Sequence, residues 1–266
     1  MTTSTPRTIH KLRHGKRATA TDHLVTEAPV ELRLDGTPLA VLMRTPGNDA
    51  ELALGFVLTE GVVLYPEEVA EVRRVPEDPE DNRWEITLSE GTEFDPEQLR
   101  RNFYATSSCG VCGKASIDAV RVAARQPPPG PILDPETLLA MPSAMRQAQE
   151  TFARTGGLHA AAAFEPDGTL VVLREDVGRH NAVDKLIGAL APQRWPIGEL
   201  VLAVSGRVSF EIVQKAAVAG IPVVCGVSAA SSLAVELAEE LGLTVVGFLR
   251  EGGFNIYAGE RRIRTS

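Results

Sequence analysis

The chain has 266 residues, enough for one large domain or two of ordinary size, and it carries a formal net charge of −8. This negative charge argues against nucleic acid as the main partner, and no stretch is long and apolar enough to predict a membrane span. Its three cysteines cannot form an even disulfide framework, which favours a reducing, cytoplasmic location.

The first 21 residues differ from the rest of the chain in charge. They contain five Lys or Arg and no acid, so the remainder of the chain has a net charge of −13. The segment is rich in Thr and lacks the apolar run of a secretory signal. We therefore expect residues 1–21 to form a basic disordered tail, with a transit peptide as the alternative.

Residues 22–126 are expected to form a small α+β domain. Apolar and polar residues alternate around a turn at Gly36-Thr37-Pro38, which is typical of a hairpin, and apolar residues then recur at helical spacing up to Gly61. The predicted elements are strands over 30–34 and 39–43, a helix over 50–58, and strands over 69–75 and 84–88.

The proline-rich run Gln126-Pro127-Pro128-Pro129-Gly130-Pro131 breaks regular structure and marks the boundary to a second domain over 131–266. Apolar strands alternate with helices in this half, which predicts an α/β fold with a mainly parallel sheet and helices outside it. The predicted elements are a helix over 135–155 broken at Pro142, strands over 160–164 and 170–173, a helix over 181–190, a strand over 200–204, a helix over 210–219, a strand over 221–224, a helix over 231–241, and a strand over 244–249.

Two of the three cysteines, Cys109 and Cys112, form a C-x-x-C within Ala105-Thr106-Ser107-Ser108-Cys109-Gly110-Val111-Cys112-Gly113-Lys114. Small neighbours, hydroxyl groups and a nearby lysine favour a reactive thiolate. Half of a zinc site is an alternative, but no second C-x-x-C or H-x-x-x-H completes it. Two buried, inert thiols are the other alternative.

In the second half, two loops follow predicted parallel strands and open helices. They are Ser205-Gly206-Arg207 and the glycine- and serine-rich run 226–232, which includes Ser228. Ligands of such sheets bind at the carboxyl ends of the strands, and helix N-termini bind phosphate through free N–H groups. Arg207 would add a charged donor. Helix capping by the serines is the alternative to an anion site.

The densest polar cluster lies over 174–181, between a predicted strand and a helix. Its Arg179, His180 and Asn181 offer donors for a phosphate or the edge of a heterocycle, while a capping and salt-bridge cluster is the alternative. His159 beside three alanines is expected to be simply packed. Cys225 closes an apolar strand and is expected to be a buried small hydrophobic residue.

These motifs together resemble those of the FdhD formate dehydrogenase accessory sulfurtransferase family. The resemblance extends from about Glu27 to the C-terminal region. It rests on Thr45-Pro46-Gly47-Asn48-Asp49, Gly55-Phe56, Glu60-Gly61, Ser108-Cys109-Gly110-Val111-Cys112-Gly113, Thr155-Gly156-Gly157-Leu158-His159-Ala160, the run from Arg174 to Lys185, Ser205-Gly206-Arg207, Phe248-Leu249-Arg250 and Phe254-Asn255-Ile256-Tyr257.

The resemblance implies a sulfur carrier that accepts sulfane sulfur from a cysteine desulfurase as a cysteine persulfide. The sulfur then passes to the molybdenum of a bis(molybdopterin guanine dinucleotide) cofactor, bound as substrate, before formate dehydrogenase receives that cofactor. The family pattern marks Cys109 as the persulfide carrier and leaves Cys112 to stabilise the persulfide or to release sulfide from it. It also implies a cytidine-deaminase-like three-layer second domain, and it leaves a homodimer open.

The same resemblance assigns part of the cofactor contact to the run after the last core strand. We expect the cofactor, or guanosine diphosphate in its place, to bind a set made of Phe248, Leu249, Arg250, Glu251, Gly252, Gly253, Ser205, Gly206, Arg207, Ser228, Arg179, His180 and Asn181. The zinc signature of deaminases, H-x-E with P-C-x-x-C, is missing, because Ala160-Ala161 follow His159. We therefore expect neither catalytic zinc nor deamination. A thiol–disulfide oxidoreductase and a cofactor chaperone without sulfur chemistry are the competing functions.

Overall fold

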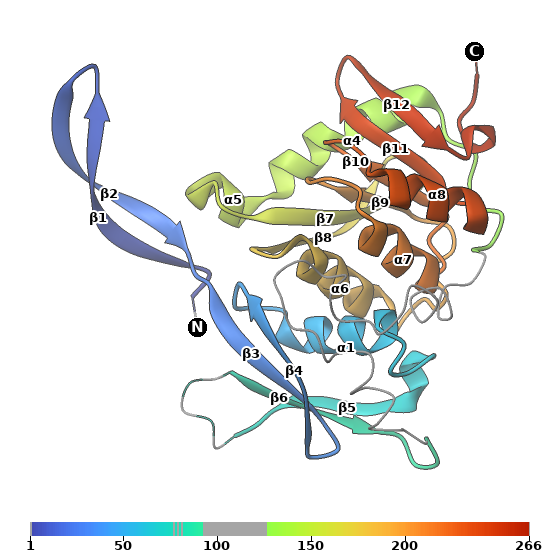
Figure 1. Cartoon of the computed structure of the whole chain (residues 1–266), viewed down its shortest axis with the longest axis horizontal. Coiled ribbons are helices and arrows are strands. Elements are labelled where there is room, and N and C mark those ends of the chain that lie inside the picture. The colour runs from blue at the N-terminus through green and yellow to red at the C-terminus, as the bar shows by residue number, and fades with distance from the viewer. Residues whose placement is uncertain (1, 77, 79, 81, 93–126, 266) are drawn as a thin grey trace.

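The computed structural model describes residues 2–76, 78, 80, 82–92 and 127–265. Three β-sheets organise this part of the chain: a two-stranded hairpin, a four-stranded sheet and a six-stranded sheet (Figure 1). The segment with Cys109 and Cys112 lies outside the described residues. In the described part, no helix combines the length and the apolar character that a membrane crossing requires.

The N-terminal residues form a hairpin, so the prediction of a disordered tail over 1–21 is wrong. Strand β1 (Ser4–Arg13) pairs antiparallel with β2 (Lys16–Val25) along its whole length. His14 and Gly15 make the turn, both with positive φ, as tight hairpin turns require. The hairpin, called the arm below, projects from the rest of the molecule (Figure 1).

The small sheet has the order β4-β3-β6-β5 and is covered on one face by helix α1. Alternating apolar residues of the central strand, Val30, Leu32 and Leu34, are buried against Leu52 and Phe56 of α1. The predicted hairpin, helix and two later strands are confirmed. The elements are β3 (Ala28–Leu34), β4 (Thr37–Arg44), α1 (Asp49–Thr59), η1 (Pro66–Glu68), β5 (Val69–Arg74) and β6 (Arg83–Leu88).

The large sheet has the order β12-β11-β10-β9-β7-β8. Only the central strands β9, β10 and β11 pair in parallel, whereas β7–β8, β7–β9 and β11–β12 are antiparallel pairs. The prediction of a mainly parallel sheet is therefore wrong. The antiparallel hairpins β7–β8 and β11–β12 form the two edges of the sheet, and only its centre is parallel. The strands are β7 (His159–Phe164), β8 (Leu170–Asp176), β9 (Val201–Val204), β10 (Val223–Gly226), β11 (Thr244–Arg250) and β12 (Gly253–Ala258).

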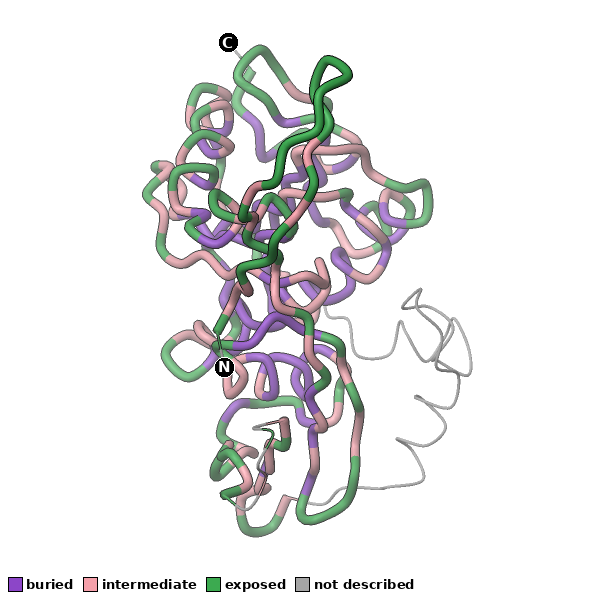
Figure 2. The backbone as a smooth tube through the Cα atoms, turned by 90° about the vertical axis from the view of Figure 1, so that its left-hand side faces the viewer, coloured by how far each residue is buried: buried purple, intermediate pink, exposed green. Residues whose placement is uncertain are grey.

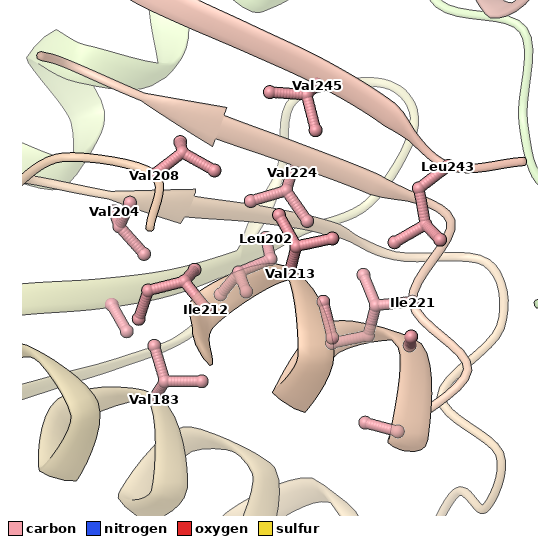
Figure 3. Packing of buried hydrophobic residues seen from close by; sticks show 14 of the residues in the cluster. Val183, Leu202, Val204, Val208, Ile212, Val213, Ile221, Val224, Leu243 and Val245 are labelled. Carbon is pink, nitrogen blue, oxygen red and sulfur yellow. The ribbon is translucent and has the colours of Figure 1, made fainter. Parts of the chain in front are cut away.

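Helices cover both faces of the large sheet. On one face, apolar side chains of α6 and α7 pack against Leu202, Val224 and Val245 (Figure 3). Apolar side chains of α8 belong to the same cluster. On the other face, Leu138 and Met141 of α4 pack with residues of alternate strand positions. This gives a helix–sheet–helix arrangement, and its likeness to cytidine deaminases stays a prediction. The helices are α4 (Pro135–Ala148), α5 (Glu150–Thr155), α6 (Arg179–Leu190), α7 (Phe210–Val218), α8 (Ser232–Leu241) and η2 (Glu260–Arg262).

The break in the 135–155 helix falls at Gln149 instead of Pro142. The carboxylate of Glu175 accepts hydrogen bonds from the backbone N–H groups of Thr151 and Phe152, at 2.9 and 2.7 Å. These N–H groups lie in the first turn of α5, where an intrahelical partner is missing. The side chain of Glu175, which is distant in sequence, thus caps the N-terminus of α5.

Helices α1 and α6 cross at two glycines, and buried segments gather at this crossing (Figure 2). A methyl group on Gly188 would overlap the carbonyl of Glu51, and one on Gly55 would overlap the carbonyl of Asp184. The two helix backbones therefore approach too closely for any side chain larger than hydrogen. This contact attaches the small sheet and α1 to the second half of the chain.

We expect Gly188→Ala to lower the free energy of unfolding by about 1–3 kcal/mol, because the crossing must open to admit the methyl group. A glycine-to-alanine change inside a helix normally stabilises it by about 1 kcal/mol. A loss of stability in Gly188→Ala would therefore indicate that the backbones of α1 and α6 approach closely. Urea unfolding measures the change. Gly252→Ala is the control, since its methyl group meets open space. A stabilised Gly188→Ala protein would show that the helices do not pack this closely.

Candidate functional site

The loops after the central strands lie side by side, as the sequence predicts. The N–H of Val227 donates to Val204 O at 3.1 Å, and that of Phe248 donates to Ser228 O at 2.9 Å. Ser228 N also lies 3.4 Å from Gly206 O. Ser205, Gly206, Ser228 and Phe248 thus form one continuous strip at the carboxyl ends of β9, β10 and β11, called the strand-end surface below.

Several backbone N–H groups of this surface are already bonded within the chain. Ser205 N donates to Ala160 O at 2.9 Å, and the Ser205 hydroxyl accepts from Ala160 N at 2.9 Å. The loops after β9 and β10 also pair with each other through a bridge between Val208 and Ala230. Several N–H groups of the loops before α7 and α8 are therefore already occupied, and an anion site at the starts of these helices stays a prediction.

Phe248 occupies an unusual backbone conformation on the strand-end surface. Its φ is 52°, in the left-handed region that bulky side chains rarely adopt. The strand register shifts between Gly247 and Arg250 at this point, and Phe248 is 39% exposed. The guanidinium of Arg250 lies 6.0 Å from the ring centroid. Strain of this kind concentrates at functional sites, so it supports a binding role for this turn.

Gly247 and Gly226 allow the loops to approach one another. A methyl group on Gly247 would lie 2.8 Å from the Tyr257 ring, and one on Gly226 would lie 2.7 Å from Val208. After Phe248, Leu249 is buried, whereas Arg250, Glu251, Gly252 and Gly253 form the exposed turn to β12. Leu249 is therefore a core residue, and the turn around it carries the exposed groups.

Arg179 and His180 lie at the start of α6, which follows β8, a strand that runs in the same direction as β9. The Nε of Arg179 is buried and has no hydrogen-bond partner among the residues that the structure describes. His180 Nε2 lies 3.5 Å from Ser209 Oγ and 3.7 Å from Glu211 Oε2. Burial would raise the pKa of Glu211, but hydrogen bonds from His180 and from its own helix N-terminus lower it to about 2.

His159 joins this group, although the sequence suggested a plain packed residue. It begins β7 and is half-buried, and its Nδ1 would lie 3.3 Å from a methyl group on Gly206. Burial lowers the pKa of His159, and the nearby positive charges of Arg179 and His180 lower it further. The imidazole is therefore neutral at neutral pH. Because β7 runs antiparallel to β9, its first residue, His159, lies at the carboxyl end of β9. The sequence alone does not reveal this direction, so it does not place His159 at the site.

Other residues of the run from Arg174 to Lys185 bind the two halves of the chain together. Asp176 is fully buried, and its Oδ2 lies 2.7 Å from Lys185 Nζ and 3.1 Å from Thr45 N. Both amide hydrogens of Asn181 are used, one by Asp176 Oδ1 at 2.9 Å and one by Met43 O at 2.8 Å. This favours a structural role for Asn181 over contact with a cofactor.

A second buried ion cluster lies beside the first. Lys215 Nζ lies 2.9 Å from both Asp184 Oδ1 and Glu60 Oε1, and it donates to Thr59 Oγ1 at 2.9 Å. Near the surface, Arg174 forms a two-pronged ion pair with Glu51, at 2.5 and 2.7 Å. We call the two buried clusters and this pair the junction, because each joins α1 or the loop before it to the large sheet and its helices.

Cys225 is fully buried in β10, and burial raises the pKa of its thiol to about 12. Because the thiolate is the reactive form, we expect Cys225 to resist alkylation by iodoacetamide in the native protein. Peptide mapping by mass spectrometry should find label on Cys109 and Cys112, and on Cys225 only after denaturation. Rapid native labelling of Cys225 would contradict its burial. The structure thus agrees with the sequence in giving Cys225 a packing role.

Two cavities lie away from the strand-end surface. One of about 370 Å³ borders the N-terminus of α1 and Trp84, and one of about 110 Å³ lies between the end of α1 and Trp195. Neither holds a predicted site residue. Among the described residues, no three His, Cys, Asp or Glu side chains group as metal ligands would, and the absence of a metal site stays a prediction.

Residues 25–264 match the FdhD/NarQ family. The chain belongs to this family. It is 51% identical to the sulfur carrier protein FdhD of Streptomyces avermitilis, over 97% of this chain and 94% of the relative. The protein of the same name from Sulfolobus acidocaldarius is 41% identical, over 96% of each chain.

A solved structure from Desulfotalea psychrophila, described as a candidate formate dehydrogenase accessory protein, shares the fold of this FdhD/NarQ chain. Its TM-score is 0.79 at 22% identity, and the match covers 99% of this chain and all of that one. At this identity the likeness supports the fold alone. The family membership itself rests on the sequence match.

Proposed function

We propose that the protein accepts sulfane sulfur as a persulfide on Cys109 and delivers it to a bis(molybdopterin guanine dinucleotide) cofactor destined for formate dehydrogenase. The family match and the printed names of its relatives support sulfur transport in general. The C-x-x-C motif contains a thiol that can carry the sulfur. The strand-end surface, where the loops after β9, β10 and β11 adjoin, is the place that we assign to the cofactor in this proposal.

The loading step is an exchange between sulfurs. The Cys109 thiolate attacks the terminal sulfur of the donor persulfide, the donor's S–S bond breaks, and its thiolate leaves. A cysteine desulfurase would be the donor. Cys112 can then release the carried sulfur by attacking the inner sulfur of Cys109, which forms a Cys109–Cys112 disulfide and frees hydrosulfide. A direct handover would need only Cys109: the S–S bond of its persulfide breaks, Cys109 leaves as a thiolate, and the substrate cofactor takes the sulfur and supplies the two electrons that reduce it to sulfide.

The observation that carries the cofactor assignment is the charge on and beside the strand-end surface. Arg207 and Arg250 are exposed, the buried Nε of Arg179 lacks a partner among the described residues, and Phe248 presents its ring. Guanidinium groups bind phosphates, and an aromatic ring can stack on guanine. These groups fit the guanine dinucleotide arms of the substrate.

We expect guanosine diphosphate to bind as a stand-in for the cofactor arms. Arg207→Ala should weaken this binding by about 1.5–3 kcal/mol, because a charged hydrogen bond to phosphate is lost. Isothermal titration calorimetry measures the affinity. Arg73→Ala, which removes an exposed arginine on β5, is the control and should bind as the wild type does. Wild-type protein that binds no guanosine diphosphate would count strongly against the site.

Labelled sulfur distinguishes the proposal from its two competitors. A sulfur carrier shows desulfurase-dependent label on one cysteine that chases to the cofactor. A chaperone without sulfur chemistry stays unlabelled, and a thiol–disulfide oxidoreductase shows only a cycle between dithiol and disulfide. The absence of label on Cys109 after incubation with desulfurase and labelled cysteine would reject the sulfur-carrier function.

A further inference from the structure

The guanidinium of Arg179 has no bonding partner in the described part of the chain. It forms no hydrogen bond and no ion pair with another described residue, and its Nε is buried. The two carboxylates at this end of α6 have other cations. Asp176 Oδ2 lies 2.7 Å from Lys185 Nζ, and Glu211 Oε2 lies 3.7 Å from His180 Nε2. A cation taken from water without a partner is costly, so Arg179 points to an anionic ligand.

His159 lies on the same side of the large sheet as Arg179. Side chains of alternate strand residues share a face, and Ala161 and Ala163 of β7 pack in the cluster that includes apolar residues of α6. His159 therefore faces the N-terminus of α6. Its imidazole adjoins Gly206 on the strand-end surface and has no hydrogen-bond partner among the described residues. A second free donor thus lies beside the free guanidinium.

Charged groups from two elements act on His159. Burial lowers its pKa most, Arg179 and His180 of α6 lower it further, and Asp176 of β8 opposes them. Helix α7 contributes Glu211, which pairs with His180. His159 is therefore neutral in the free protein at neutral pH. An anion bound beside both His159 and Arg179 would favour the charged form of the imidazole.

We propose that Arg179 and His159 bind a phosphate group at the edge of the strand-end surface, and that His159 takes up a proton from solvent when the phosphate binds. Guanidinium groups match phosphate oxygens, and a phosphate dianion retains charge for a second cation beside the first. A carboxylate fits less well, because Arg179 alone would balance its single charge. The assignment of this phosphate to a nucleotide arm of the cofactor rests on the proposed function.

The pH dependence of guanosine diphosphate binding, measured by calorimetry, tests the proposal. Between pH 6 and pH 8, the wild-type affinity should fall about tenfold relative to that of His159→Gln, because affinity falls as the pH rises through the pKa of His159 in the complex. The titration of the nucleotide itself is common to both proteins. Arg179→Ala should weaken binding at least about tenfold. His23→Gln removes an exposed histidine of the arm and should bind as the wild type does.

A nuclear magnetic resonance titration of the His159 ring in the wild type tests the site without a substitution in the binding protein and without guanine. His159→Gln identifies the resonance. Inorganic pyrophosphate should raise the midpoint of the titration. An unchanged midpoint, parallel pH dependence of wild type and His159→Gln, or full binding by Arg179→Ala would overturn the inference and leave the proposed function intact. A raised midpoint in a protein that binds no guanosine diphosphate would support the phosphate site and reject its assignment to the guanine arms.

Discussion

Cys109→Ala is expected to abolish activation of formate dehydrogenase in cells, because the persulfide has no other carrier in the proposed mechanism. Cys112→Ala should retain part of the activity, since the persulfide needs one sulfur atom on the protein and the second thiol only assists release. Enzyme activity in a strain that lacks the native protein, complemented with each variant, measures the effect. The two substitutions form a matched pair within one C-x-x-C motif.

Cys225→Ala is the control for the number of thiols. It removes the buried thiol of β10, so it should leave sulfur transfer intact and affect only packing. Thermal unfolding of all three variants separates loss of function from loss of fold. Full activation of formate dehydrogenase by the Cys109→Ala protein would reject Cys109 as the carrier. An inactive Cys112→Ala protein beside an active Cys109→Ala protein would reverse the two roles.

The local elements could largely be predicted from the sequence. Alternation over 30–34 and helical spacing over 50–58 led to β3 and α1, and the all-apolar run over 200–204 led to the buried strand β9. The order of parallel strands also placed Ser205, Ser228 and Phe248 side by side. These predictions succeeded because each depends on neighbours in sequence or on the general direction of parallel strands.

The errors concern contacts between distant segments. The charge of residues 1–21 predicts a disordered tail, whereas the β-forming Thr residues and the turn at His14-Gly15 build a hairpin. Strand patterns do not reveal which sheet a hairpin joins, so the sequence does not predict the antiparallel β7–β8 pair as part of the large sheet, and it does not predict the strand β12 at all. Likewise, the sequence predicts Asn181 to be a ligand group, because its partner Met43 lies 138 residues away.

The junction leads to the second large prediction, which concerns stability. Lys215→Ala should lower the free energy of unfolding by about 3–5 kcal/mol, because it leaves the buried carboxylate of Asp184 without its cation. Burial alone would lower the pKa of Lys215, but Asp184 and Glu60 raise it above its ordinary value, so the lysine is charged in the folded protein. Urea unfolding measures the loss.

An exposed ion pair provides the matched control. Arg264 Nη1 lies 2.7 Å from Asp134 Oδ1, as close as a good buried pair, but the two side chains are 63% and 48% exposed. Arg264→Ala should therefore cost only about 0–1 kcal/mol. Similar losses of unfolding free energy for Lys215→Ala and Arg264→Ala would show that burial does not determine how much the Lys215 ion pair contributes to stability.

The double variant Lys215→Met with Asp184→Leu tests the cause of the loss. It removes both fully buried charges, and Glu60 can reach solvent because its side chain is partly exposed. A buried ion pair replaced by apolar groups of similar size can be neutral for stability, so the double variant should be more stable than Lys215→Ala. A double variant less stable than Lys215→Ala would indicate that the loss comes from packing instead of from an unpaired charge.

The pH dependence of Lys215→Ala gives an independent readout. Burial raises the pKa of Asp184 and Lys215 opposes this, so removing the lysine raises that pKa further. A group whose pKa is higher in the folded state binds more protons there, and stability then increases as the pH falls through that pKa. The gap in unfolding free energy between wild type and Lys215→Ala should therefore narrow as the pH falls from neutral toward the ordinary acidic range of an aspartate. A gap that stays constant would mean that Asp184 is not held in the folded interior as an unpaired carboxylate.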